Sequence, residues 1–205
     1  MGTSVVRAFI AVELSPEIKK GLEQVSAELK RRLPGTAVRW VPVENIHITL
    51  KFLGDVSMAN IDMLKKILDS VAALHRSFEI SVGGIGAFPK LHQPRVVWVG
   101  MEAPSELLAI QHGLEVETAR LGYAPEDRPF SPHLTLGRVS RNASGGEIHR
   151  ISEILSTYKV GFLGVTRVQA LYLFRSDLDP SGAVYSRMHS ARLGQPYSNT
   201  TDHHS

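Results

Sequence analysis

Two short stretches of this sequence carry the same pattern. Residues 46–53 read Ile-His-Ile-Thr-Leu-Lys-Phe-Leu, and residues 132–138 read Pro-His-Leu-Thr-Leu-Gly-Arg. Apolar residues alternate with other residues in both, which is typical of a β-strand with one buried face. The opposite face of each strand then presents a histidine and, two residues later, a threonine. In the first strand, the residues that we assign to the core are Ile46, Ile48, Leu50 and Phe52.

The segments around these strands repeat as well. Residues 7–17, a helix and then His47 are matched by residues 96–106, a helix and then His133. Such internal repetition indicates two copies of one structural unit. We therefore predict an α+β fold with two similar lobes. Each lobe is a mostly antiparallel sheet with helices on its outer face, and the active-site cleft lies between the sheets.

Apolar periodicity and turn residues give the expected element bounds. Helices are predicted over about 16–33, 59–74, 105–121 and 147–155. Strands are predicted over about 4–14, 38–41, 46–53, 78–88, 95–101, 132–139, 164–174 and 183–193. We assign residues 1–195 to a single domain and expect the polar tail over residues 196–205 to be disordered.

Length and composition limit the class of protein. The chain has 205 residues, 43% of them hydrophobic and 21% charged, which fits a globular domain. It contains no cysteine, which excludes disulfides, zinc–thiolate sites and thiol nucleophiles. No apolar run approaches the ~18 residues of a membrane span, and the N-terminus shows no signal-peptide pattern. We expect a cytoplasmic protein that does not associate with membranes.

The charge balance favours a small anionic ligand site. Lys and Arg number 23 and Asp and Glu 20, which leaves a net charge of +3. A charge of this size does not require a long nucleic-acid footprint, but it suits a local phosphate site.

The paired histidines predict acid–base catalysis. A neutral imidazole accepts a proton from water and an imidazolium donates one to a leaving oxygen, so His47 and His133 facing one cleft supply both functions. The hydroxyls of Thr49 and Thr135 can bind phosphate oxygens. The sequence shows no His-x-x-x-His or His-Glu-x-x-His pattern, so we expect neither a metal nor another cofactor. This set of residues is typical of in-line displacement at a phosphodiester.

Two cations are candidates for neutralising the charge that develops on phosphate. Strict alternation places Lys51 on the same face as His47, which makes it the favoured cation. Arg138 falls on the opposite face from His133, and it reaches the cleft only if its strand ends or bulges near Gly137. Either side chain can instead be a surface charge.

These motifs resemble the two-histidine phosphoesterase superfamily. The paired His-x-Thr-x (HxTx) motifs at residues 47–50 and 133–136 are most similar to those of the RNA 2′,3′-cyclic phosphodiesterases, also called 2′-5′ RNA ligases. The resemblance extends over about residues 5–193. It includes the stretches Arg7–Val12, Trp40–Pro42, Val97–Gly100 and Phe174–Leu178, with Gly182 and Tyr185.

The resemblance implies a reaction and a role for each site residue. In that family the first-motif histidine donates a proton and the second accepts one. His47 would then protonate the departing ribose 3′-oxygen, and His133 would activate water, which leaves a 2′-phosphate on the RNA. Thr49 and Thr135 would hold phosphate oxygens, and Arg138 matches the family's phosphate-binding arginine. Ligation of 2′-5′ RNA is formally the reverse reaction.

Several alternatives stay open at this point. Phe9 and Trp40 are candidates for stacking on a terminal base, with core packing as the alternative for each. The expected partners are RNA ends or nucleotides with a 2′,3′-cyclic phosphate, and we expect a monomer. A non-catalytic module that binds RNA ends or nucleotides, and a phosphodiesterase that acts on a small cyclic phosphate, are the competing functions.

Overall fold

The structure, a computed structural model, describes residues 4–33, 35–179 and 182–194. The predicted disordered tail over residues 196–205 lies outside the described residues. The strands are β1 (Val5–Val12), β2 (Val38–Trp40), β3 (Ile48–Ser57), β4 (Phe78–Lys90), β5 (Gln93–Met101), β6 (Leu134–Val139), β7 (Phe162–Val168), β8 (Ala170–Asp179) and β9 (Gly182–Arg192). The α-helices are α1 (Pro16–Arg32), α2 (Ile61–Ala73), α3 (Ser105–Ala119) and α4 (Gly145–Thr157), and the 3₁₀ turns are η1 (Val43–Asn45) and η2 (Met58–Asn60).

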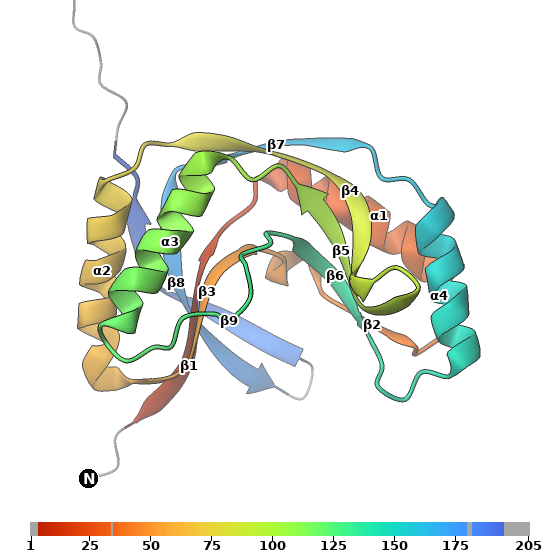
Figure 1. Cartoon of the computed structure of the whole chain (residues 1–205), viewed down its shortest axis with the longest axis horizontal. Helices are drawn as coiled ribbons and strands as arrows, with labels where there is room; N and C mark the ends of the chain where they lie inside the picture. The colour runs from red at the N-terminus through yellow and green to blue at the C-terminus, as the bar shows by residue number, and fades with distance from the viewer. Residues whose placement is uncertain (1–3, 34, 180–181, 195–205) are drawn as a thin grey trace, which may run out of the picture.

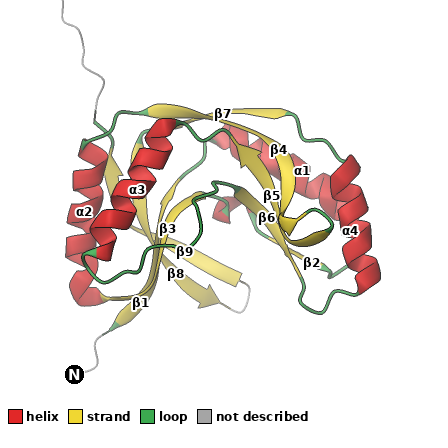
Figure 2. Cartoon of the chain, viewed as in Figure 1, coloured by secondary structure: helices red, strands yellow, loops and turns green. Residues whose placement is uncertain are grey.

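The strands form two antiparallel sheets. Sheet A has the strand order β3-β1-β8-β9, and sheet B has the order β2-β6-β5-β4-β7. Helices α2 and α3 pack on sheet A and helices α1 and α4 pack on sheet B, so that the sheets lie between the helices (Figure 1). Figure 2 shows the same layers coloured by secondary structure. The predicted α+β fold with two lobes is confirmed, and we call the face of each sheet that is turned away from its helices its site face.

The helices begin where the sequence provides a cap. The Ser15 hydroxyl accepts a hydrogen bond from the backbone N–H of Ile18 at the start of α1, and Pro16 occupies the first helical position. Helix α4 begins with a capping box formed by Ser144 and Glu147. The apolar face of α1 is buried against sheet B, which aligns the helix with the sheet.

The two sequence repeats exchange elements between the lobes. In the first half, β1 and β3 belong to sheet A and α2 packs on it, whereas β2 and β4 belong to sheet B and α1 packs on it. In the second half, β5, β6 and β7 belong to sheet B and α4 packs on it, whereas β8 and β9 belong to sheet A and α3 packs on it. Each lobe therefore contains parts of both repeats, and the repeat marks equivalent elements rather than the boundaries of the lobes.

One predicted strand is wrong. The sequence predicts a single strand over residues 164–174, but the structure has β7 and β8 there, separated at Gln169. Strand β7 pairs with β4 in sheet B, and β8 pairs with β1 in sheet A. The chain passes from one sheet to the other without a glycine or proline, because an extended backbone can form hydrogen bonds with β4 and then with β1. An apolar pattern does not show which sheet a strand joins.

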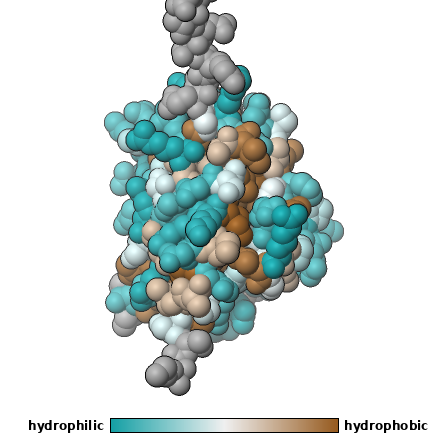
Figure 3. All heavy atoms as spheres, turned by 90° about the vertical axis from the view of Figure 1, so that its left-hand side faces the viewer, coloured by the Kyte–Doolittle hydropathy of each residue, from teal (hydrophilic) through white to brown (hydrophobic). Residues whose placement is uncertain are grey.

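Hydrophilic and apolar side chains both lie on the outer surface near α2 and α3. Viewed from the left-hand side of Figure 1, this surface is mostly hydrophilic, with apolar strips between the polar residues (Figure 3). Across the described ranges, none of the helices combines the length and apolar character that a membrane crossing needs.

Candidate active site

The two histidines occupy equivalent positions at the start of a strand. His47 directly precedes β3 and His133 directly precedes β6. The Nδ1 atom of His133 lies 2.7 Å from the carbonyl oxygen of Ser131, and the backbone of Asn45 forms a hydrogen bond with the His47 ring. An Nδ1–H that donates to Ser131 leaves the Nε2 lone pair of His133 free to accept a proton.

The segment before His47 is also tied to sheet A. The Asn45 side-chain amide donates a hydrogen bond to the carbonyl of Ala183 on β9, at 2.9 Å. Ile46 and Ile48, on either side of the histidine, are buried in the core. Alternation then directs His47 to the site face, as the sequence predicts.

A β-bulge follows the threonine in both motifs. In sheet A, Thr49 pairs with Ala11 and Lys51 pairs with Ile10, so Leu50 is an extra residue. In sheet B, Thr135 pairs with Trp98 and the next pair skips Leu136. A bulge of one residue reverses the alternation of the residues that follow it. The expectations for Lys51, Phe52 and Arg138 all depend on this reversal.

The expectation that Lys51 shares a face with His47 is wrong. The bulge turns Lys51 toward α3, where its side chain has no exposed surface. Its Nζ lies 2.7 Å from Glu115 Oε2 and 2.5 Å from the carbonyl oxygen of Ala124. Phe52, which we assigned to the core, instead pairs with Phe9 and is 60% exposed.

The same reversal brings Arg138 to the site face of sheet B. It lies opposite Val96 on β5, and its side chain is exposed. The condition set by the sequence, a bulge next to Gly137, is met. A Cβ on Gly137 would lie 2.7 Å from Val38 Cγ1, so this position needs glycine for β2 to approach β6.

Tyr185 of one lobe lies within electrostatic range of Arg138 of the other lobe. Burial raises the pKa of the Tyr185 hydroxyl, and the positive charge of Arg138 acts in the opposite direction. Tyr185 belongs to β9 of sheet A and Arg138 to β6 of sheet B. The site faces of the two sheets therefore lie near each other at these residues.

His47 lies in an aromatic environment. Its ring stacks on Phe9 with centroids 4.7 Å apart, and the Tyr185 ring meets it edge-on at 5.3 Å. Phe174 stacks on Phe9 at 5.3 Å, and Phe9 is only 3% exposed. Phe9 therefore packs between rings and has no room to stack on a base, so its candidate role in base stacking is wrong.

Trp40 belongs to the core side of sheet B. It pairs with Gly137 on β6, and its indole packs against the hydrophobic core. Val38, which lies on the same side of β2, is buried. For Trp40 as for Phe9, the alternative interpretation of core packing fits the structure.

An aromatic side chain also packs against His133, and no sequence motif indicated it. Phe88 meets the His133 ring edge-on at 4.9 Å and also contacts Trp98 at 5.2 Å. The indole lies so close to Gly86 that a Cβ there would come within 2.3 Å of it. Phe88 pairs with Val96, and Phe174 pairs with Phe9 at the equivalent place in sheet A. Aligning the strand pairs, rather than the motifs alone, would have indicated these aromatics.

Burial makes His47 a weak base. It lowers the pKa of His47 from 6.5 to about 4, and this effect outweighs the backbone of Asn45 and the carboxylate of Glu13, which raise the pKa. The ammonium of Lys19 lowers the pKa further. In the free protein, His47 is therefore neutral near pH 7.

Acidification from pH 6.5 to pH 4 is expected to destabilise the protein through His47. The unfolded imidazole keeps its ordinary pKa of 6.5, whereas the folded one has a pKa of about 4. The unfolded state binds more protons in this window, so the stabilisation is complete above pH 6.5 and is lost as the pH falls toward 4. A shift of this size corresponds to about 3 kcal/mol. Urea unfolding across this range should show a smaller pH dependence for His47→Gln than for the wild type.

An exposed histidine provides the control for this measurement. His149 lies on α4 near Glu153 and is largely exposed. The variant His149→Gln should keep the pH dependence of the wild type. Identical pH dependence in His47→Gln and the wild type would contradict the assigned shift.

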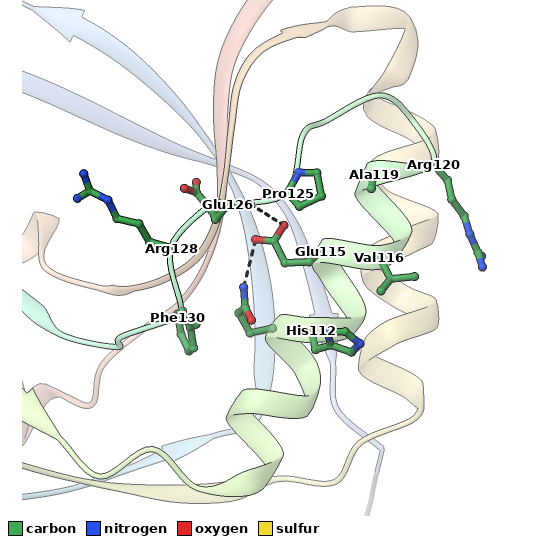
Figure 4. A pocket seen from close by; sticks show the side chains of 10 residues that line it. His112, Glu115, Val116, Ala119, Arg120, Pro125, Glu126, Arg128 and Phe130 are labelled. Atoms are coloured by element: carbon green, nitrogen blue, oxygen red, sulfur yellow. Dashed lines mark hydrogen bonds between the residues drawn. The ribbon is translucent and has the colours of Figure 1, made fainter.

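A cavity of about 570 Å³ lies between α3 and the segment that leads to β6 (Figure 4). Its lining includes His112 and Glu115 on α3, and Arg128 and Phe130 in the segment, but neither motif histidine. Glu115 accepts hydrogen bonds from the Gln111 side chain and from the backbone N–H of Glu126. The ion pair of Lys51 and Glu115 thus holds the segment that ends at His133.

Fold and site together define a class of protein. Two sheets from one chain each present a His-x-Thr pair, with equivalent bulges and aromatic neighbours, and an arginine follows the second pair. The sequence profile of the LigT-like phosphoesterases matches this chain twice, over residues 12–98 and 99–185. The chain belongs to the LigT-like phosphoesterase family, which confirms the predicted resemblance and the expectation of a phosphoric ester hydrolase.

Relatives and solved structures agree with this assignment. The RNA 2′,3′-cyclic phosphodiesterase of Methanothermobacter thermautotrophicus is 35% identical over 92% of this chain and 99% of its own length. That of Archaeoglobus fulgidus is 33% identical over 88% of this chain and 96% of its own. Escherichia coli LigT complexed with 3′-AMP superposes with a TM-score of 0.75, at 27% identity, over 93% of this chain and 99% of LigT.

Proposed function

We propose that this protein hydrolyses RNA ends with a 2′,3′-cyclic phosphate to 2′-phosphomonoesters, without a metal. His47 is the general acid and His133 the general base. The observation that carries the proposal is the matched placement of the two histidines, each directly before a strand and each bonded to the backbone two residues earlier. The names of the relatives supply the substrate class.

The proposed reaction is an in-line displacement. His133 Nε2 accepts a proton from water as the water oxygen forms a bond to phosphorus. The bond between phosphorus and the ribose 3′-oxygen breaks, and the departing oxygen takes a proton from His47. His133 thus takes up one proton and His47 gives up one. The phosphate stays on the 2′-oxygen.

His47 must be charged to act as the acid. Its pKa of about 4 in the free protein means that it gains this proton together with the substrate. An anionic phosphate next to the ring favours the imidazolium and raises the pKa. The stacked ring of Phe9 presents its electron-rich face to the imidazolium, which also favours the charged form.

Thr49, Thr135 and Arg138 complete the proposed site. The two hydroxyls donate hydrogen bonds to non-bridging phosphate oxygens, and Arg138 balances the charge that builds up in the transition state. The proposed substrates are RNA ends or nucleotides with a cyclic phosphate. One chain provides both histidines, so we propose that the monomer is active. We also propose that the protein is cytoplasmic. Reversal of the same steps would give 2′-5′ RNA ligation.

Product analysis tests this proposal. The protein is incubated in chelator with an oligoribonucleotide that ends in a 2′,3′-cyclic phosphate, and the product end is identified by mass spectrometry and phosphatase sensitivity. We expect a 2′-phosphate end. A 3′-phosphate end would reverse the assignment of the leaving group. Binding without turnover would favour a non-catalytic module, and turnover of only a small cyclic phosphate would change the substrate class.

A further inference from the structure

Two arginines lie side by side on the site face of sheet B. Arg39 on β2 pairs directly with Arg138 on β6. Directly opposed residues of an antiparallel pair point to the same side of the sheet. Val38 is buried in the core and Arg39 is exposed, so both guanidinium groups lie on the site face.

The strand that carries Arg39 is held in this register. The backbone N–H of Val41 donates to the carbonyl of Leu136 at 2.8 Å, and that of Ser140 donates to the carbonyl of Ala37 at 2.7 Å. Trp40 packs over Gly137, and its ring lies 3.1 Å from the position of a Cβ there. Strand β2 has only three residues. The two backbone hydrogen bonds and the packing of Trp40 on Gly137 hold Arg39 next to Arg138.

This pairing places two like charges opposite each other. Such a pair destabilises a sheet unless something else compensates the charge. In the described parts of the chain, neither arginine forms an ion pair with a carboxylate, whereas other arginines do. The site face thus keeps two positive charges for an external anion.

We propose that Arg39, next to Arg138, provides a second phosphate subsite, which binds the phosphodiester that precedes the terminal nucleotide of the RNA. This inference rests on the proposed function and narrows its substrate to chains of at least two nucleotides. Arg138 follows the His133 motif on the same strand, and Arg39 lies one strand further away, at a strand spacing of about 4.8 Å. A guanidinium presents two parallel N–H donors to a phosphate, which gives a directional contact.

A pair of substrates that differ only in the charge of one linkage tests the subsite. The first is a diribonucleotide that ends in a 2′,3′-cyclic phosphate, and the second is the same molecule with a neutral methylphosphonate linkage. We expect the wild type to prefer the charged linkage by about tenfold in kcat/KM, and Arg39→Gln to bring this ratio close to one. For a longer oligoribonucleotide, log kcat/KM falls with log salt concentration, and this negative slope should be shallower by about 0.7 in Arg39→Gln than in the wild type.

Arg95 provides the matched control. It lies on the neighbouring strand β5 and donates a hydrogen bond to the carbonyl of Ser140. Alternation places it on the face opposite Val96 and Arg138. Arg95→Gln removes the same charge from the same sheet and should keep the preference of the wild type for the charged linkage.

The linkage preference decides the outcome. A ratio in Arg39→Gln equal to that of the wild type would overturn the subsite, even if the activity on both substrates fell together. If the wild type turns over neither substrate, the same comparison is made by calorimetric binding of the 2′-phosphorylated dinucleotide and its methylphosphonate analogue. Loss of the linkage preference in binding would support the subsite although the proposed reaction had failed, and an unchanged preference would overturn it.

Discussion

Alanine in place of His133 is expected to lower kcat for the cyclic phosphate by about 10²- to 10⁴-fold. His47→Ala should cause a loss of the same order, because each histidine supplies one of the two proton transfers. Steady-state rates with a cyclic-phosphate oligoribonucleotide measure both effects. His189→Ala is the control, since His189 bonds to Asp69 on α2, on the helix side of sheet A. Full activity in His47→Ala or His133→Ala would contradict the assignment of that histidine.

The pH profile of the same variants separates the two roles. The wild type should show a bell-shaped dependence of kcat/KM, because one imidazole must be charged and the other neutral. Loss of the base in His133→Ala should remove the acidic limb of the residual rate. Loss of the acid in His47→Ala should remove the alkaline limb. The opposite pattern would mean that the two histidines exchange roles.

Replacing Lys51 with methionine is expected to lower the free energy of unfolding by about 3–5 kcal/mol. The Lys51 side chain is fully buried, and Glu115 is 13% exposed, so the variant leaves a mostly buried carboxylate without its partner. It also removes the donor to the Ala124 carbonyl. Urea unfolding, followed by circular dichroism, measures the loss.

An exposed ion pair on the same helix gives the comparison. Glu117, two residues after Glu115, pairs with Arg120, and Glu117→Gln should change stability by less than about 1 kcal/mol. The double variant Lys51→Met/Glu115→Leu should recover part of the loss, because no unpaired charge remains. Equal losses for Lys51→Met and Glu117→Gln would contradict a structural role for the buried pair.

The two readings of Lys51 show where sequence reasoning stops. Strict alternation assigns it to the site, and the bulge at Leu50 moves it to the opposite face. The same bulge in the second motif brings Arg138 into the site. A bulge is a property of how two strands pair, and neither strand alone reveals it. Arg39 was missed for a similar reason, since its importance depends on the residue opposite it.

Local sequence was sufficient for the features that depend on local physics. The cap at Ser15, the apolar faces of the helices and the two His-x-Thr strands follow from residue types and their spacing. The repeat of those strands also predicted a fold with two lobes. Tertiary structure alone decided which sheet each strand joins, the exposure of Phe52, the stacking that encloses Phe9, and the side to which Lys51 and Arg138 point. These properties arise from contacts between segments far apart in the chain, so no pattern within one segment encodes them.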